Sequence, residues 1–465
     1  MKNSNFSKLY VILAGLIFFC YACDFSNQEN TNVNAPKYVF YFIGDGMGHQ
    51  HVKLTEAYLH ACNHDAFGFD KLAFDTLPVS GTSTTHAANR LITGSAAAGT
   101  ALATGHKTTI DRIAMSPDGE KTWQSIATVC KNKGSKVGII TSVCINHATP
   151  AVFYAHATDR DNYVDIGKQM CDSDVDFFGG GGIKDTEKNT VNIYDMLAEA
   201  GYLVVRKDTN LNDLKIDDKM ALFNPVLGHE AEMPYAIDRK YKGGYSLADI
   251  TRVAIENLYD DTGFFIMVEG GKIDWAAHAN DAATIVREVI DFDKAVQEAL
   301  KFYLQHPDET LIVVTSDHET GGLGLGNAEM KYQTDYALLE KQSMSVEYMA
   351  ELLHSGDIQP SDLPEIFDLD DLSRKESEQV KAAAVFAGNE VSHIRYGGYS
   401  PLPVIYGQIL NKRAGVGFTT WEHTAAPVPV YAIGTGAEIF SGQMDNTDIP
   451  KKIMQLAGYD FPENQ

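Results

Sequence analysis

Five short apolar runs, separated by stretches of helical character, constrain the fold of this chain most strongly. They are rich in β-branched and aromatic residues, which is typical of strands buried on both faces of a parallel sheet. The runs are Tyr38–Ile43, Lys136–Thr141, Phe264–Val268, Thr310–Thr315 and Val428–Ile433. Amphipathic or alanine-rich stretches between them predict crossover helices. These stretches are Ala96–Ala103, Trp123–Asn132 and Ala282–Tyr303. The pattern predicts a three-layer α/β/α sandwich around a central, mostly parallel sheet.

We expect one main domain over residues 36–463, preceded by a polar linker at residues 24–35. One polar stretch, from about Asn327 to Gly417, has helical periodicity in places and separates two strand-like runs. We interpret it as an insertion into the domain. The glycine run Gly179–Gly182 is interpreted as a turn where chain segments pack closely, because no nucleotide-binding pattern follows it.

The first segment, Met1–Cys23, has the features of an export signal. Two lysines precede the apolar run Leu9–Cys23, which is too short to span a bilayer comfortably. Ala22 before Cys23 resembles the cleavage site of a bacterial lipoprotein. Two interpretations stay open: a lipid anchor on Cys23, or simple cleavage nearby. Either one predicts an exported protein, in the periplasm or anchored on the cell envelope.

Composition and charge exclude several function classes. With 44% hydrophobic and 22% charged residues, the chain is typical of globular proteins rather than disordered ones. It has 38 Lys and Arg against 62 Asp and Glu, a net charge of −24, which disfavours nucleic acid as a partner. A small anionic substrate is compatible with that charge if cations gather at one site. Outside the signal segment lie four cysteines, which we interpret as structural while their pairing stays open: Cys62, Cys130, Cys144 and Cys171.

Acidic side chains follow three of the predicted strands. Asp45 comes after the first run, Glu269 ends the third, and Asp317 follows the fourth with His318 beside it. In open α/β sheets, ligands bind outside the carboxyl ends of the strands, so these side chains are expected to converge. Asp274 lies four residues before a histidine, so both would project from the same face of one helix.

Two kinds of metal site fit these residue types. Imidazole and carboxylate ligands together favour zinc, as at Asp274 with His278 and at Asp317 with His318. Asp45, Glu269 and the hydroxyl of Thr149 offer the all-oxygen ligands that magnesium prefers. Each motif alone is more often a helix cap or an ordinary loop pair. Their joint placement at strand ends makes the metal interpretation persuasive.

The candidate nucleophile is Ser95, at the start of a stretch of small residues. Backbone N–H groups at a helix start favour an incoming phosphate anion. The alternative interpretation is a plain capping serine. A serine hydroxyl is a poor nucleophile until its pKa falls, and a nearby zinc ion lowers it without a general base.

At these residues the chain resembles the alkaline phosphatases, over about Pro36 to Gly458. The likeness rests on six motifs in order: Gly44–Gly48, Thr93–Ala97, His147–Pro150 with Arg160, Val268–Asp274 with His278, Thr315–Glu319, and Glu422–Thr424. It implies an alkaline phosphatase fold and the hydrolysis of small phosphate monoesters, with residues 36–463 as the catalytic domain.

The resemblance also implies a role for each site residue, with two zinc ions and one magnesium ion. One zinc would be held by Asp274, His278 and His423. The other would be held by Asp45, Asp317 and His318. The magnesium would be held by Asp45, Thr149 and Glu269. Arg160 would grip two phosphate oxygens, a bidentate task that suits its planar guanidinium. Ser95 would attack phosphorus in line and form a phosphoserine, with activity rising into the alkaline range.

Three residues depart from the family pattern. Gly94 stands where many relatives have an aspartate that orients the arginine, which implies a looser Arg160 and easier product release. His147 and Trp275 stand where bacterial relatives often have aspartate and lysine. His147 is therefore expected beside the third metal, whose magnesium identity it puts in question. Relatives are commonly homodimers, and this chain is compatible with that state.

Two other function classes fit these residues less well. A phosphodiesterase or sulfatase of the same superfamily would share the metal core, but Thr149, Glu269 and Arg160 argue against it because a diester has fewer free oxygens. A non-catalytic protein that captures metal or phosphate would have no use for Ser95.

Overall fold

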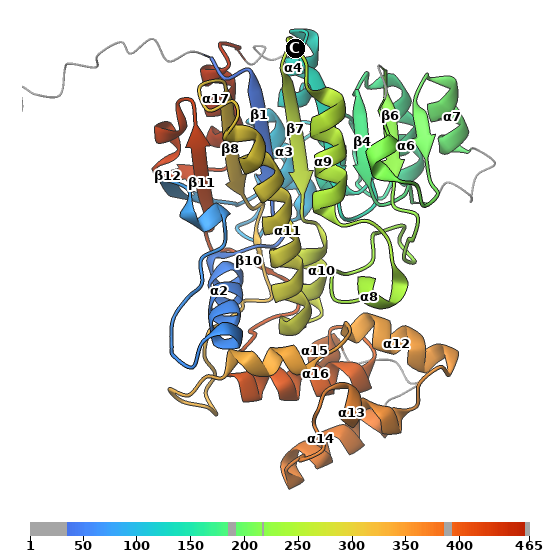
Figure 1. Cartoon of the computed structure of the whole chain (residues 1–465), viewed down its shortest axis with the longest axis vertical. Helices are drawn as coiled ribbons and strands as arrows, with labels where there is room; N and C mark the ends of the chain where they lie inside the picture. The colour runs from blue at the N-terminus through green and yellow to red at the C-terminus, as the bar shows by residue number, and fades with distance from the viewer. Residues whose placement is uncertain (1–34, 185–191, 216–217, 386–392, 461–465) are drawn as a thin grey trace, which may run out of the picture. The chain divides into compact units, whose positions relative to one another are not determined.

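The computed structural model describes residues 35–184, 192–215, 218–385 and 393–460. Among these residues, ten strands form one sheet in the order β12-β2-β11-β8-β1-β7-β3-β4-β6-β5 (Figure 1). Their bounds are β1 Tyr38–Ile43, β2 Val79–Thr84, β3 Lys136–Thr141, β4 Phe177–Gly180, β5 Leu203–Val205, β6 Met220–Phe223, β7 Phe264–Glu269, β8 Thr310–Thr315, β11 Val428–Gly434 and β12 Gly442–Asp445. Only β11 runs antiparallel to its neighbours, β2 and β8. The mostly parallel sheet predicted from the sequence is confirmed.

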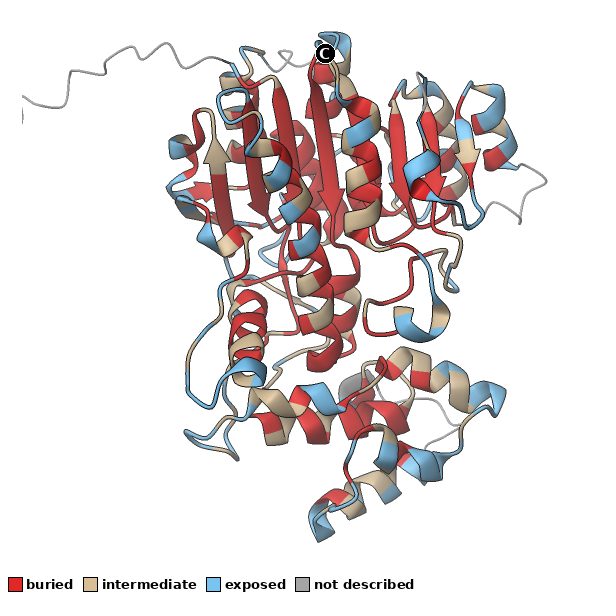
Figure 2. Ribbon diagram, in the orientation of Figure 1, coloured by how far each residue is buried: buried red, intermediate tan, exposed pale blue. Residues whose placement is uncertain are grey.

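The strands are buried on both faces, as their composition predicts. In β1, Tyr38, Phe40 and Phe42 pack into one core and the alternate side chains pack into another on the opposite face. Figure 2 shows the sheet as an almost continuously buried layer. Each face is closed by helices, which gives the three-layer sandwich.

Helices α9 (Leu247–Leu258) and α11 (Ala282–Tyr303) lie on one face of the sheet. Helices α3 (Ser95–Thr104), α4 (Ile126–Asn132) and α17 (Asp448–Leu456) contribute to the core on the other. The predicted bounds of α11 match the observed ones. Helix α4 begins three residues later than predicted, because the side chain of Ser125 accepts the Thr128 N–H and caps the helix there.

The register of the central strands brings their carboxyl ends to one level. Ile43 at the end of β1 lies opposite Glu269 of β7 on one side and Thr315 of β8 on the other. Glu269 in turn lies opposite Thr141, the last residue of β3. Because parallel strands end at the same edge, the residues that follow them start from one small area.

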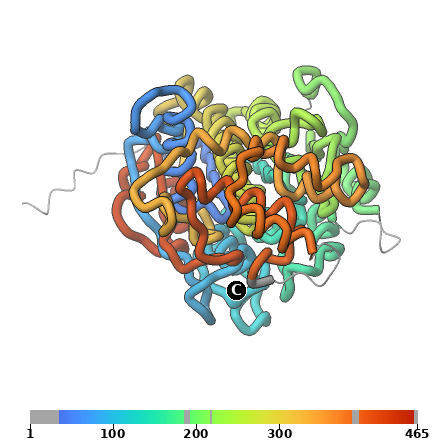
Figure 3. The backbone as a smooth tube through the Cα atoms, turned by 90° about the horizontal axis from the view of Figure 1, so that it is seen from below, coloured from blue at the N-terminus to red at the C-terminus, as the bar shows by residue number. Residues whose placement is uncertain are grey.

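The segment between β9 (Glu319–Thr320) and β10 (His423–Thr424) leaves the sheet and is mainly helical. The two short strands pair with each other. The main helices between them are α12 (Val346–Ser355), α14 (Arg374–Val385) and α16 (Pro401–Ala414), drawn in orange in Figure 3. The segment is tied to the main body by buried polar groups, since Ser345 N–H and Oγ donate to Asp238 at 2.8 and 2.6 Å.

The four cysteines outside the signal segment are not paired with one another. Within the described ranges, no helix has both the length and the apolar character needed to cross a bilayer. The predicted signal at Met1–Cys23 lies outside the described residues, as does most of the linker at residues 24–35.

Candidate functional site

The candidate site lies where β1, β7 and β8 end. The loop after β1 turns sharply at Gly46, which has a φ of 72°. A Cβ at Gly46 would lie 2.9 Å from Asp274 Cα, so only glycine lets the loop approach α10 (Lys272–His278) this closely. The Gly46 N–H donates to Asp317 Oδ1 at 3.1 Å and so joins the loops after β1 and β8.

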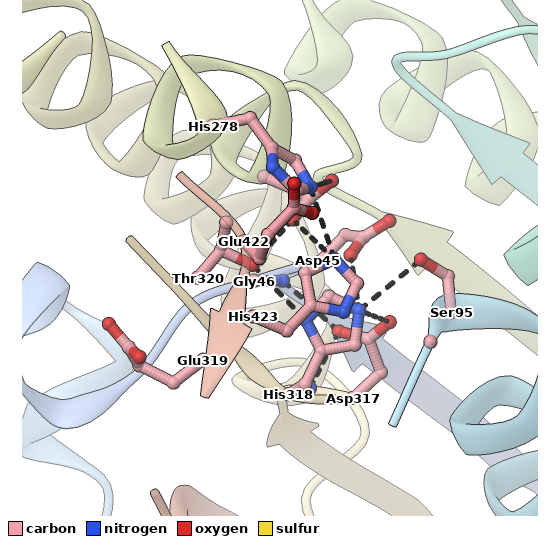
Figure 4. Close-up of polar contacts among 12 residues, drawn as sticks. Asp45, Gly46, Ser95, His278, Asp317, His318, Glu319, Thr320, Glu422 and His423 are labelled. Carbon is pink, nitrogen blue, oxygen red and sulfur yellow. Dashed lines mark hydrogen bonds and ion pairs between the residues drawn. The ribbon is translucent and has the colours of Figure 1, made fainter. Parts of the chain in front are cut away.

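One cluster consists of Asp45, Asp317 and His318, all with buried side chains. His318 Nε2 lies 3.4 Å from Asp45 Oδ1 and 3.1 Å from Asp317 Oδ2. The Ser95 hydroxyl, on the first residue of α3, lies 3.2 Å from the same nitrogen. Figure 4 shows Ser95 approaching this cluster from one side. Two carboxylates and one hydroxyl therefore meet around one imidazole nitrogen.

A second cluster consists of Asp274, His278 and His423. Asp274 and His278 project from one face of α10, as their spacing predicts, and His278 Nε2 lies 3.4 Å from Asp274 Oδ2. His423 comes from β10, and its Nε2 lies 3.1 Å from His278 Nε2 and 3.6 Å from Asp274 Oδ1. The stacked rings of His318 and His423, with centroids 3.6 Å apart, connect the two clusters.

A third cluster joins Asp45 to Glu269 and His147, which lies just before the short helix α5 (Ala148–Ala151). Thr141 Oγ1 donates to Glu269, while Glu269 Oε1 has no hydrogen-bond partner. The buried hydroxyl of Thr149 and Nδ1 of His147 also lack partners. His147, which the resemblance predicts beside the third metal, has a ring nitrogen within 4.8 Å of a carboxylate oxygen of Asp45 and of one of Glu269.

Burial and mutual repulsion perturb the acids of these clusters. Burial, with the charge of Asp317, holds the pKa of Asp45 well above its usual range. Burial also raises the pKa of Glu269 to about 8. Asp274 behaves differently: although burial opposes the shift, the nearby His278 and other histidines lower its pKa. Acids this crowded and buried are costly unless positive charge accompanies them.

The donor sets fit metal ions. Both carboxylate oxygens of Asp45 and one of Asp317 are buried without any hydrogen-bond partner. Buried polar atoms are normally satisfied, so such a group of orphaned oxygens is suited to holding a cation. Imidazole with carboxylate is the ligand chemistry of zinc, and the oxygen-rich set around Glu269 also suits magnesium. The residues present therefore fit the metals that the sequence predicts.

Ser95 and Arg160 lie in one cavity of about 420 Å³. Arg160 Nη2 makes a hydrogen bond of 2.8 Å with His147 Nε2, so in this chain a histidine orients the guanidinium. Trp275 also lines the cavity and packs edge-on against His147, with ring centroids 6.1 Å apart. Eleven of the twelve residues singled out from the sequence lie in this cavity or in the three clusters beside it. The twelfth, Thr149, is close enough to Glu269 to oppose the rise that burial causes in the pKa of that carboxyl.

Several supporting groups were missed in the sequence. Thr320 Oγ1 donates to Asp274 Oδ1 at 2.6 Å and lies 3.2 Å from Nδ1 of His318. The backbone carbonyls of Thr93 and Trp421 bond Nδ1 of His423 and of His278 respectively. These contacts turn Nε2 of each histidine toward the clusters. Thr320 lies in β9, three residues after Asp317, so its nearness to Asp317 in the sequence was the one available signal.

Comparisons with known proteins agree with the family resemblance seen in the sequence. A sequence model of the alkaline phosphatase family matches residues 36–459. Alkaline phosphatase 3 of Bacillus subtilis is 33% identical over 447 residues, covering 94% of this chain and 92% of the relative. The crystal structure of a cold-active alkaline phosphatase from Shewanella sp. has a TM-score of 0.79 at 31% identity and covers 90% of this chain and 99% of its own.

A third match is a mutant of the alkaline phosphatase from the Antarctic bacterium TAB5, in which a histidine is replaced by glutamate and Mg is bound in the M3 site. Its TM-score is 0.66 at 27% identity, and the match covers 92% of this chain and 99% of that one.

Proposed function

The chain belongs to the alkaline phosphatase family and is a phosphomonoesterase, and from this premise we propose that it works through a phosphoserine on Ser95 beside two zinc ions and one magnesium ion. The observation that carries the proposal is the position of the Ser95 hydroxyl, 3.2 Å from His318 Nε2 at the edge of a buried cluster of acids and histidines. A serine that only capped the helix would not be expected to face that cluster.

The three clusters supply the ligands for this proposal. Asp274, His278 and His423 would hold one zinc. Asp45, Asp317 and His318 would hold the other. Asp45, Thr149 and Glu269 would hold the magnesium. When bound, these ions would supply Lewis acidity, which lowers the pKa of a hydroxyl or water and stabilises a leaving oxygen. A relative, the TAB5 enzyme in which a histidine is replaced by glutamate, binds Mg in its M3 site, so magnesium is a metal that this family can bind.

The residues of the chain would position the phosphoryl group. Ser95 is the first residue of α3, so the free N–H groups of that helix start lie beside its hydroxyl and favour a phosphate anion. Arg160, held by His147, would donate two parallel N–H bonds to non-bridging oxygens. Ser95 Oγ would then attack phosphorus as the ester oxygen leaves on the opposite side, and water would later displace Ser95 from the same phosphorus.

The test is Ser95→Ala compared with Ser173→Ala, a serine outside the site. We expect Ser95→Ala to lose most turnover on an aryl phosphate, by a factor on the order of a thousand or more, while zinc content and thermal unfolding stay unchanged. Acid-quenched wild-type enzyme should carry one phosphate on the peptide that contains Ser95. Unchanged turnover in Ser95→Ala would remove Ser95 from the mechanism.

The proposal includes export and assembly. The segment Met1–Cys23 is proposed to be an export signal with a lipid on Cys23, which would anchor the protein on the cell envelope. The mass of the mature amino terminus tests this, since an unacylated residue other than Cys23 there excludes the anchor. Association as a homodimer is tested by light scattering. For a phosphodiesterase, a sulfatase or simple capture of metal, no observation speaks in favour.

A further inference from the structure

The cavity at Ser95 is larger than the phosphoryl group needs. A phosphate occupies on the order of three water volumes, about 90 Å³, whereas the cavity is about 420 Å³. Part of its lining has no role in binding metal or phosphate. These residues come from the loop at residues 229–232, from α10 and from the helical segment between β9 and β10. They are Glu230, Glu232, Trp275, Glu347, Glu351 and Tyr399.

Two of these carboxylates are neutralised by a lysine of their own. Glu230 pairs with Lys184, whose ammonium also lies 4.1 Å from the centroid of the Tyr163 ring. Glu351 pairs with Lys242 at 2.7 Å. These two acids therefore add little net charge to the cavity.

The other two carboxylates share one lysine. Lys272 Nζ lies 3.9 Å from Glu232 Oε1. The same ammonium opposes the rise that burial causes in the pKa of Glu347, so it lies within electrostatic reach of that carboxylate as well. Its charge is covered by two rings, Tyr235 at 3.5 Å and Trp275 at 4.5 Å from their centroids. Two carboxylates against one covered ammonium leave this wall of the cavity with an excess negative charge.

Glu347 is flanked by aromatic side chains on the same cavity. Burial raises the pKa of Tyr399, and the charges of Glu347 and of Asp274 add to that rise. The Tyr399 hydroxyl thus lies within electrostatic reach of both the catalytic centre and Glu347. Trp275, directly after Asp274, is half-buried and lines the cavity too. A carboxylate with two aromatic rings is the combination that recognises alkylammonium groups.

We propose that Glu347, Trp275 and Tyr399 form a subsite for a positively charged leaving group, and that the enzyme prefers phosphate monoesters of amino alcohols to neutral or anionic esters of the same size. The inference rests on the proposed function, because it concerns the leaving-group side of the same site. It gives the helical segment between β9 and β10 a role in substrate choice.

The experiment compares kcat/KM for phosphocholine with that for 3,3-dimethylbutyl phosphate, its neutral isostere. The quaternary ammonium carries its charge at every pH, so the ratio isolates the effect of that charge. We expect the metal-loaded wild-type enzyme to prefer phosphocholine about five- to tenfold, the range of a part-exposed ion pair with aromatic support. Glu347→Gln should bring the ratio to about one and leave the rate on an aryl phosphate within about twofold.

Glu351→Gln is the matched control, because it removes the same charge from the same helix at a carboxylate that has its own lysine. It should keep most of the preference. Equal losses in both variants would mean a general field effect and overturn the subsite, as would a wild-type ratio near one.

A measurement on the wild-type enzyme alone keeps the inference testable if Glu347→Gln does not fold. Choline should inhibit hydrolysis of the aryl phosphate more strongly than 3,3-dimethylbutanol, and equal inhibition would contradict the subsite. A metal-loaded wild-type enzyme without activity on any of the three esters would instead count against the proposed function.

Discussion

Replacing Thr320 with valine tests how the site is held together. The Thr320 hydroxyl is fully buried and has a single proton, which it donates to Asp274 Oδ1 at 2.6 Å. Its oxygen is then free to accept the Nδ1–H of His318 at 3.2 Å. That hydrogen bond keeps the His318 proton on Nδ1 and leaves the Nε2 lone pair facing Asp45, Asp317 and Ser95. Thr320 therefore sets the tautomer of one proposed ligand and the orientation of another.

Valine has nearly the shape of threonine but can make neither hydrogen bond. A hydrogen bond to a charged partner contributes about 1.5–3 kcal/mol, and a factor of ten corresponds to about 1.4 kcal/mol. We expect the dissociation constant for zinc to rise roughly 10- to 100-fold, the range typical of groups that orient metal ligands. Activity at limiting zinc should fall with it.

The assay is a zinc titration of the metal-free protein in a chelator buffer, followed by activity and thermal unfolding. Thr320→Ser is the control, because it keeps the hydroxyl and should bind zinc nearly as wild type does. The reasoning is refuted if Thr320→Val and Thr320→Ser bind zinc equally well.

Three further predictions follow. Gly94→Asp should steady Arg160 and so tighten phosphate inhibition and lower kcat; unchanged inhibition constants would contradict this. The new side chain has room, because a Cβ at Gly94 meets only Ile110 Cδ1, at 3.8 Å. His147→Asp should raise the ratio of magnesium to zinc in metal analysis, since oxygen replaces nitrogen at the third cluster. Burial raises the pKa of Glu288 to about 7, so stability should fall as pH rises from about 4.5 to 7. Glu288→Gln should flatten that fall. Above about pH 7 it should raise the free energy of unfolding, measured with urea, by at most about 3 kcal/mol.

Central strands were predictable from the sequence, whereas strands toward the two ends of the sheet were not. The runs that form β1, β3 and β8 are mostly apolar, because both faces of these strands are buried, and their predicted bounds match. Strand β2 is polar and only partly buried, so nothing in its composition distinguishes it from a loop. Gly179 and Gly180 end strand β4 instead of forming part of the turn predicted for Gly179–Gly182. Close packing was the correct part of that interpretation, since a Cβ at Gly180 would lie 1.8 Å from Thr141 O.

For the site, sequence reasoning reached the residues with distinctive chemistry and missed those with common chemistry. Acids directly after buried strands, such as Asp45 and Asp317, stand out because charge is rare there. Thr320 and the carbonyl of Thr93 act only through their position in the folded chain, and threonine and peptide groups occur everywhere. The excess charge of Glu347 depends on which carboxylates lie beside Lys272, and that pairing joins segments far apart in the sequence.

The sheet register makes metal binding a condition of stability as well as of activity. Because Ile43, Glu269 and Thr315 end at one level, Asp45, Glu269 and Asp317 come together at a place with no access to water. Without cations, these carboxyls repel one another, and burial together with the charge of Asp317 raises the pKa of Asp45. Burying and crowding these carboxyls costs free energy in the metal-free fold, and a bound cation would remove that cost. The geometry that assembles the ligands therefore destabilises the metal-free fold, so metal affinity and folding stability cannot be altered separately at these three positions.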